Sequence, residues 1–241
     1  MSGRCAILTG AGSGVGRATA VLLASRGWRL ALLGRTRATL MQTEQLCGAG
    51  EHVVVEADVG DDAAVHRAVE EANAAFKGRL DALLNVAGVA PRAAVAATDS
   101  RMMRSALDVN VVGPAALISA SWPRLVASRG AIVNVSSMAA VDPFSGFLAY
   151  GASKAALESL TRSVNVEGRE AGVRAFTLTL GAVETKMLRG LFGTDDCPPE
   201  AALQPEDVAR EILECLEGKR DHDKPIFLVP QQPRRPPDVV S

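Results

Sequence analysis

The chain has 241 residues, with 26 basic and 27 acidic side chains and a formal net charge of −1. A charge so close to zero gives no electrostatic reason for binding nucleic acid or an anionic membrane, and no apolar run approaches the roughly 20 residues that span a bilayer. The four cysteines lack Cys-x-x-Cys spacing and the three histidines are dispersed. We therefore expect free thiols, a cytoplasmic location and no metal site.

Short apolar runs alternate with longer helix-like stretches along the chain. Strands are predicted at residues 5–8, 30–33, 53–55, 80–84, 131–135, 175–178 and 226–229, and helices at 15–25, 38–46, 63–76, 101–126, 152–170 and 205–217. The alternation predicts an α/β fold of the Rossmann type: a doubly wound, mostly seven-stranded parallel sheet with helices on both faces. We expect residues 1–229 to form one domain, followed by an extended or disordered proline-rich tail at 230–241.

A glycine-rich loop, residues 9–16, follows the first predicted strand and opens the first helix. Glycines let the backbone turn tightly and approach a pyrophosphate, whose charge then faces free N–H groups at the helix N-terminus. A purely structural tight turn is the alternative, but four glycines within seven residues favour a phosphate loop. The predicted dinucleotide-binding residues here are Thr9, Gly10, Ser13, Gly14, Val15 and Gly16.

The end of the second strand bears on which dinucleotide binds. An acidic side chain that would hold the ribose 2′-OH of NAD is absent there, and the next acid along the chain is Glu44. Arg35 can instead pair with a 2′-phosphate, and Thr36 can donate a hydrogen bond to the same group. A solvated arginine at a strand end is the alternative. The pattern favours NADP(H) over NAD(H).

Two further strand ends supply candidate cofactor contacts. Asp58 and Val59 follow the third strand, where the carboxylate either accepts from the adenine amino group or caps a turn. Asn85 ends the fourth strand and is followed by the small residues Ala87 and Gly88, beside which a ribose or the adenine can pass closely.

Tyr150 and Lys154 are four residues apart in a helical stretch, so their side chains project from one face. A free phenol has a pKa of about 10, and a nearby ammonium lowers it. A phenol tuned in this way can protonate a carbonyl oxygen as hydride arrives, or remove the hydroxyl proton in the reverse direction. A surface helix pair is the alternative, although Tyr150 is the only tyrosine of the chain.

Ser137 closes the fifth strand at its carboxyl edge, where its hydroxyl can hold the substrate oxygen beside Tyr150. Side chains alternate along a strand, so only one of Ser136 and Ser137 should face the site. Asn110 lies inside a long helical pattern, where asparagine is unfavourable. It is either a satisfied buried amide or a residue that kinks the helix and orders a proton path.

Together these motifs resemble the short-chain dehydrogenase/reductase family, in its shorter, single-domain branch, over residues 4 to about 190. The resemblance implies that Asn110, Ser137, Tyr150 and Lys154 form the catalytic set and that Lys154 also bonds the nicotinamide ribose. It implies that Thr185 contacts the carboxamide, with Gly181, Val183 and Tyr150 also among the cofactor-binding residues. The activity it implies is NADP(H)-dependent hydride transfer between a ketone or aldehyde and an alcohol.

Three residues or segments depart from the family pattern: Val86 stands where a second asparagine is usual, Leu180 where a proline is usual, and the usual C-terminal Asp-Gly-Gly is missing. We therefore expect a homodimer, through the helices beginning near Arg101 and Ala152, rather than a homotetramer. The substrate is expected to bind between Ser137 and Tyr150 and between Met187 and Gln204, where Met, Phe and Leu side chains suit a fairly apolar small-molecule carbonyl. A non-catalytic NADP(H)-binding protein is the main alternative; sugar-nucleotide epimerases share Tyr-x-x-x-Lys but are longer and carry a different glycine loop.

Overall fold

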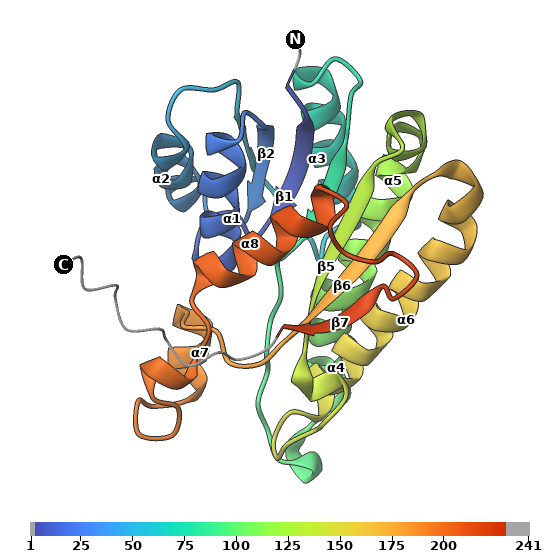
Figure 1. The fold of residues 1–241 in the computed structure, drawn as a ribbon. Coiled ribbons are helices and arrows are strands. Elements are labelled where there is room, and N and C mark those ends of the chain that lie inside the picture. Colours follow the sequence, from blue (N-terminus) through green and yellow to red (C-terminus); the bar gives the residue numbers. More distant parts are fainter. Residues whose placement is uncertain (1–2, 230–241) are drawn as a thin grey trace, which may run out of the picture.

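A parallel seven-stranded sheet with the order β3-β2-β1-β4-β5-β6-β7 forms the middle of the molecule (Figure 1). The strands are β1 (Cys5–Thr9), β2 (Arg29–Gly34), β3 (Val53–Glu56), β4 (Ala82–Asn85), β5 (Ala131–Ser137), β6 (Arg174–Leu180) and β7 (Ile226–Val229). The predicted Rossmann-type fold is thereby confirmed. The computed structural model describes residues 3–229, so the predicted proline-rich tail lies outside the described residues.

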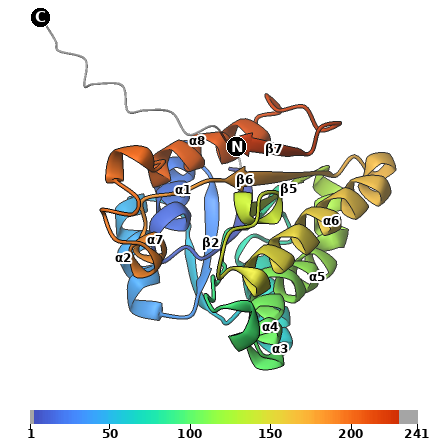
Figure 2. The same ribbon diagram turned by 90° about the horizontal axis from the view of Figure 1, so that it is seen from below.

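Helices cover both faces of the sheet (Figure 2). They are α1 (Gly14–Ser25), α2 (Arg37–Cys47), α3 (Asp62–Ala75), α4 (Ser100–Leu107), α5 (Gly113–Ser128), α6 (Leu148–Ala171), α7 (Lys186–Leu191) and α8 (Pro205–Leu216). The strand order reverses between β1 and β4. Open α/β sheets bind their ligands at such a reversal, beyond the carboxyl ends of the strands.

Alternating side chains of β1 divide the buried residues into two cores. Ile7 packs with Val65 of α3 and Leu117 of α5 on one face of the sheet. Leu8 packs with Leu23 of α1 and Ile212 of α8 on the other. Because both faces are covered, the strand is apolar from Cys5 to Leu8, which is the pattern from which the parallel sheet was predicted.

A chain of buried polar side chains crosses β4, β5 and β6. The Asn85 Nδ2 atom donates to Asn134 Oδ1 at 2.7 Å, and Asn134 Nδ2 donates to Thr161 Oγ1 of α6 at 2.9 Å. Thr161 Oγ1 lies 2.7 Å from Thr177 Oγ1. Asn85, Asn134 and Thr177 are direct neighbours in the strand register, so the chain of hydrogen bonds runs straight across the sheet.

The uninterrupted helix predicted at 101–126 is wrong. Helix α4 ends at Leu107, a π-helical turn occupies Asp108–Val112, and α5 begins at Gly113. Pro114 in the first turn of α5 has no N–H group to continue the regular ladder of hydrogen bonds, which favours the wider turn. A Cβ atom on Gly113 would lie 2.2 Å from the Val59 carbonyl oxygen, so this junction needs glycine.

Two other helices differ from the prediction. Helix α6 begins at Leu148 rather than at residue 152, so Tyr150 lies in its first turn. The six-residue α7 was not predicted as a helix; Thr185 caps it by accepting from the Leu188 N–H at 3.2 Å. No helix within residues 3–229 is long and apolar enough to cross a membrane.

Candidate active site

The glycine-rich loop joins β1 to α1 at the strand-order reversal. Gly10 and Gly14 have positive φ angles of 67° and 49°, which favour glycine. A Cβ atom on Gly16 would lie 2.1 Å from the Gly10 carbonyl oxygen. Ser13 is the N-cap of α1 but makes no side-chain cap bond, so the N–H groups of the first turn stay open to an anion. The loop therefore fits a pyrophosphate.

The Thr9 hydroxyl ties the loop to the end of β4. It accepts from the N–H groups of Val86 and Ala87, each at 3.0 Å, and donates to the Leu84 carbonyl at 3.3 Å. A Cβ atom on Gly10 would lie 3.0 Å from Ala87, so the two backbones pass in close contact. Thr9 thus fixes the shape of the predicted cofactor site through protein hydrogen bonds.

Arg35, Thr36 and Arg37 are all exposed at the end of β2 and the start of α2. Thr36 is the N-cap of α2 and makes no side-chain cap bond, and the first turn holds no acidic residue. No carboxylate of residues 3–229 forms an ion pair with Arg35. This corner of the molecule therefore presents uncompensated positive charge and a helix N-terminus, both of which suit a phosphate.

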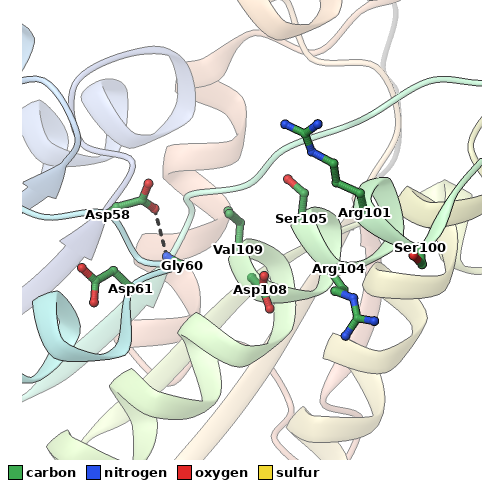
Figure 3. Close-up of a pocket in the computed structure, with 9 residues that line it drawn as sticks. All are labelled: Asp58, Gly60, Asp61, Ser100, Arg101, Arg104, Ser105, Asp108 and Val109. Carbon is green, nitrogen blue, oxygen red and sulfur yellow. Dashed lines mark hydrogen bonds between the residues drawn. The ribbon is translucent and has the colours of Figure 1, made fainter.

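A hollow of about 570 Å³ opens between the β3–α3 loop and α4 (Figure 3). Asp58 lies at its edge, and its Oδ1 atom accepts from the Gly60 N–H at 2.9 Å. The turn-capping alternative for Asp58 is therefore realised in the structure. Val59 is buried next to it, and Val109 of the π-helical turn lines the hollow from the other side.

Tyr150 and Ser137 are brought together at the carboxyl end of β5. The Ser137 hydroxyl lies near the phenol, where it stabilises the charged form of Tyr150, and it accepts from the Ala139 N–H at 3.2 Å. Ser136 points the other way, donating to Glu158 Oε1 at 2.9 Å, as the alternation along the strand predicts. Burial raises the pKa of Tyr150, and the Ser137 hydroxyl opposes part of that rise.

Lys154 lies one helical turn beyond Tyr150 and is 4% exposed. Its Nζ atom donates to the Val135 carbonyl at 2.8 Å and lies 5.8 Å from the centre of the Tyr150 ring. Burial lowers the pKa of Lys154 to about 8. The expected lowering of the phenol pKa by this ammonium does not appear: desolvation is the larger influence on Tyr150.

Asn110 is fully buried in the π-helical turn. Its Oδ1 atom accepts from the Val89 N–H, and its Nδ2 atom donates to the Val89 carbonyl and to Ser153 Oγ, all at 2.9 Å. Ser153 in turn donates to the Tyr150 carbonyl at 2.7 Å. The amide is therefore satisfied by protein groups, and through Ser153 it supports the turn of α6 that carries the phenol.

The segment after β6 returns to the glycine loop. A Cβ atom on Gly14 would lie 3.0 Å from Thr185 Cγ2, so Thr185 packs directly against this glycine. Gly181 and Val183 lie in the same segment, where Val183 pairs with Leu203. Although Leu180 replaces the usual proline, the segment is held by backbone hydrogen bonds from Leu203 to Ala182 and from Glu184 to Leu203, at 2.9 and 2.8 Å.

Three residues of this region were not found from the sequence: Ser153, Glu158 and Arg17. Ser153 lies within the Tyr-x-x-x-Lys motif, but its contact with Asn110 spans 43 positions. The buried Glu158 carboxylate accepts from Ser136 and from Thr179, each at 2.9 Å, and ties α6 to the sheet. Arg17 Nη2 donates to the Gly12 carbonyl at 2.6 Å. Of the three, only Arg17 could have been found from its position, because it directly follows the last glycine of the loop.

The site has the parts of a dinucleotide-binding oxidoreductase: a glycine loop at the sheet reversal and a paired phenol and hydroxyl beyond it. Among residues 3–229 no group of three or more histidine, cysteine or acidic side chains is placed to hold a metal ion. A family model described as short chain dehydrogenase matches residues 4–195. The chain belongs to the short-chain dehydrogenase/reductase family, as its motifs predicted, and is an oxidoreductase of that family.

Similar proteins extend over most of the chain. Carbonyl reductase family member 4 of Danio rerio is 32% identical over 218 residues, which are 89% of this chain and 92% of that protein. The structure of 3-ketoacyl-(acyl-carrier-protein) reductase from Brucella melitensis, complexed with NADH, matches with a TM-score of 0.82 at 28% identity, covering 89% of this chain and 91% of that one. A metagenomic short-chain oxidoreductase in complex with NADP matches with a TM-score of 0.80, also at 28% identity, covering 95% and 97%.

Proposed function

We propose that the protein is an NADP(H)-dependent carbonyl reductase that interconverts a ketone or aldehyde and its alcohol. The observation that carries the proposal is the placement of the Ser137 hydroxyl beside the Tyr150 phenol, with the buried Lys154 one helical turn away. A protein that only binds dinucleotides has no need of a partly buried phenol beside a serine hydroxyl. The non-catalytic alternative is therefore the weaker reading.

Each residue of the site has a distinct role in this proposal. A bound reduced nicotinamide supplies the hydride. Ser137 and Tyr150 hold the carbonyl oxygen of the substrate by hydrogen bonds, and the Tyr150 hydroxyl gives that oxygen its proton. In the reverse direction Tyr150 takes the proton of the alcohol. Lys154 places a positive charge beside the phenol when its Nζ atom is protonated, and in this proposal it also bonds the nicotinamide ribose.

The preference for NADP(H) is argued from the exposed corner at Arg35. A 2′-phosphate there meets Arg35, the open N-terminus of α2 and Thr36, whereas a ribose hydroxyl meets no acceptor carboxylate of residues 35–37. A charge-assisted hydrogen bond is worth about 1.5–3 kcal/mol, or roughly a tenfold to hundredfold change in affinity. Solved relatives bind either cofactor, so the discrimination must come from this chain's own residues.

Arg35→Asp is expected to weaken NADPH binding by about a hundredfold, because it removes the charge-assisted bond and adds a like charge. NADH binding should change by less than about threefold, since NADH lacks the phosphate. Titration of cofactor fluorescence at constant ionic strength measures both dissociation constants. Arg67→Ala, an exposed arginine of α3, is the matched control. Equal losses for both cofactors would show that Arg35 does not recognise the phosphate.

A homodimer built through α4, α5 and α6 is part of the proposal. Val112, Leu148 and Val166 are large apolar side chains that are 52%, 44% and 78% exposed on or between these helices. Burying them against a second copy removes apolar surface from water. Light scattering coupled to size-exclusion chromatography should give twice the mass of one chain. A monomer at micromolar concentration would contradict this arrangement.

Absorbance of the reduced nicotinamide at saturating NADPH, with a panel of ketones, aldehydes and quinones, tests the function itself. NADPH consumption that depends on one carbonyl class, and that is slower with NADH, is the expected result. Measurable NADPH binding without consumption on any carbonyl would instead favour the non-catalytic alternative.

A further inference from the structure

The connection between β4 and α4 carries an arginine, Arg92, that bridges segments distant in the sequence. Its guanidinium carbon lies 5.9 Å from the centre of the Phe147 ring and 5.3 Å from that of Phe192. Its Nη1 atom donates to the Leu191 carbonyl at 3.0 Å, at the end of α7. One side chain thus contacts both the entry to α6 and the exit from α7.

A glycine leaves room for the Arg92 side chain. Gly146 has a φ of 87°, and a Cβ atom there would lie 3.1 Å from Arg92 Cγ. Ala93 pairs with Phe147 in an isolated parallel bridge, with its N–H donating to the Gly146 carbonyl at 2.9 Å. Arg92 is therefore fixed at its base by backbone pairing and held at its tip by α7.

The aromatic rings connect this contact to the catalytic phenol. Phe147 is 4% exposed and directly precedes α6, whose first turn holds Tyr150; the two rings are 6.0 Å apart. Phe147 and Phe192 are stacked, with centres 5.9 Å apart and planes 14° from parallel. The position of α7 is thereby coupled through two rings to the helix turn that carries Tyr150.

The segment that contains α7 also has hydrogen bonds of its own, made by Arg189. Arg189 makes two hydrogen bonds to the Glu184 carboxylate, at 2.7 and 2.5 Å, and its Nη1 atom donates to the Cys197 carbonyl at 2.8 Å. These bonds close the segment on itself. The contacts of Arg92, in contrast, attach it to the loops beside Tyr150.

We infer that Arg92 is a positioning residue that holds α7 and Phe192 over the active site and so sets the fit of the carbonyl substrate. The inference rests on the proposed function. The guanidinium lies near both stacked rings, Phe147 and Phe192, whose apolar surface suits a substrate with an apolar group next to its carbonyl. Loss of Arg92 frees α7 to move away while leaving the phenol, the serine and the glycine loop in place.

Arg92→Ala is expected to raise the KM of the carbonyl substrate by about tenfold, the combined effect of a cation–π contact and one hydrogen bond. The NADPH dissociation constant and the melting temperature should change little, because Arg92 is exposed and contacts neither the glycine loop nor the two hydrophobic clusters that flank the sheet. Arg92→Lys keeps the charge but loses the planar guanidinium, so its KM should lie between that of the wild type and that of Arg92→Ala. Arg67→Ala is the control for loss of an exposed arginine.

A double-mutant cycle tests whether Arg92 affects substrate binding through its contact with Phe192. Arg92→Ala and Phe192→Ala should raise KM by less in combination than the product of their separate effects, because each removes the same contact. Strictly multiplicative effects would overturn the inference.

Hydrogen exchange of the amides in residues 186–192 gives a readout that does not need turnover. Faster exchange in Arg92→Ala than in the wild type is expected there, with no change in residues 14–25. If the wild type shows no NADPH-dependent turnover and this exchange still rises, the hold of Arg92 on α7 stands and the proposed function alone fails. If exchange and KM are both unchanged, the inference is overturned.

Discussion

Tyr150→Phe is expected to lower turnover by about a thousandfold, within the range that general acid–base groups contribute. That loss corresponds to about 4 kcal/mol of activation free energy. The variant keeps the ring that packs near Phe147 and removes only the hydroxyl that meets Ser137. The NADPH dissociation constant should therefore stay within about twofold of the wild-type value. Steady-state absorbance and fluorescence titration measure the two quantities; turnover that survives in the variant would contradict the role of Tyr150.

Neighbouring serines provide a matched control for the same site. Ser137→Ala should lower turnover by about a hundredfold, because it removes one of the two hydroxyls that hold the carbonyl oxygen. Ser136→Ala, one residue earlier, should leave turnover unchanged and lower the free energy of unfolding, because its hydroxyl serves the buried Glu158 carboxylate. Similar turnover losses in both variants would mean that the effect of Ser137 is structural.

Lys154→Met is expected to abolish most turnover and at the same time to stabilise the fold at pH 7. Burial lowers the pKa of Lys154 from 10.5 to about 8, so the folded state carries a penalty for the charged form of about 3 kcal/mol. Loss of the hydrogen bond to the Val135 carbonyl offsets about 1 kcal/mol of the gain. Urea unfolding at pH 7 should show a net increase of about 2 kcal/mol in the free energy of unfolding.

The pH dependence of the free energy of unfolding tests independently whether Lys154 destabilises the fold. Between pH 8 and 10.5 the unfolded chain holds a proton on Lys154 that the folded protein has released. The lysine penalty is thus complete below pH 8 and disappears as the pH rises to 10.5, so wild-type stability gains relative to Lys154→Met over this interval. A variant that is less stable than the wild type at pH 7 would show that the lysine supports the fold.

The sequence was sufficient for the sheet and for the placement of Tyr150 and Lys154 on one helix face. Continuous apolar runs predicted the seven strands, and the alternation along β5 predicted that only one of Ser136 and Ser137 faces the site. It was not sufficient for the helix boundaries around the site. The π-helical turn at Asn110 depends on Pro114 and on the close approach of Gly113 to Val59, and the latter contact joins residues more than fifty positions apart.

The direction of the Tyr150 pKa shift could not be predicted for a related reason. Four-residue spacing shows that Tyr150 and Lys154 share a helix face, but desolvation depends on how much of the fold covers them. Burial raises the pKa of one group and lowers that of the other. The contacts of Arg92 were also hidden, since they join residues about 55 and 100 positions apart, and a lone arginine in a loop has no sequence pattern.

The hydrogen-bonded row of Asn85, Asn134 and Thr177 has a consequence for how the strands find their alignment. Apolar residues point to both faces of β4, β5 and β6, so hydrophobic burial alone distinguishes poorly between the native pairing and a slip along a strand. A slip of one residue between β4 and β5 would place Asn85 opposite Val133 or Val135, so its Nδ2 donor would lose the Asn134 acceptor. The polar row therefore fixes the register of β5 against its neighbours. That register places Ser137 level with the Tyr150 phenol without help from a ligand.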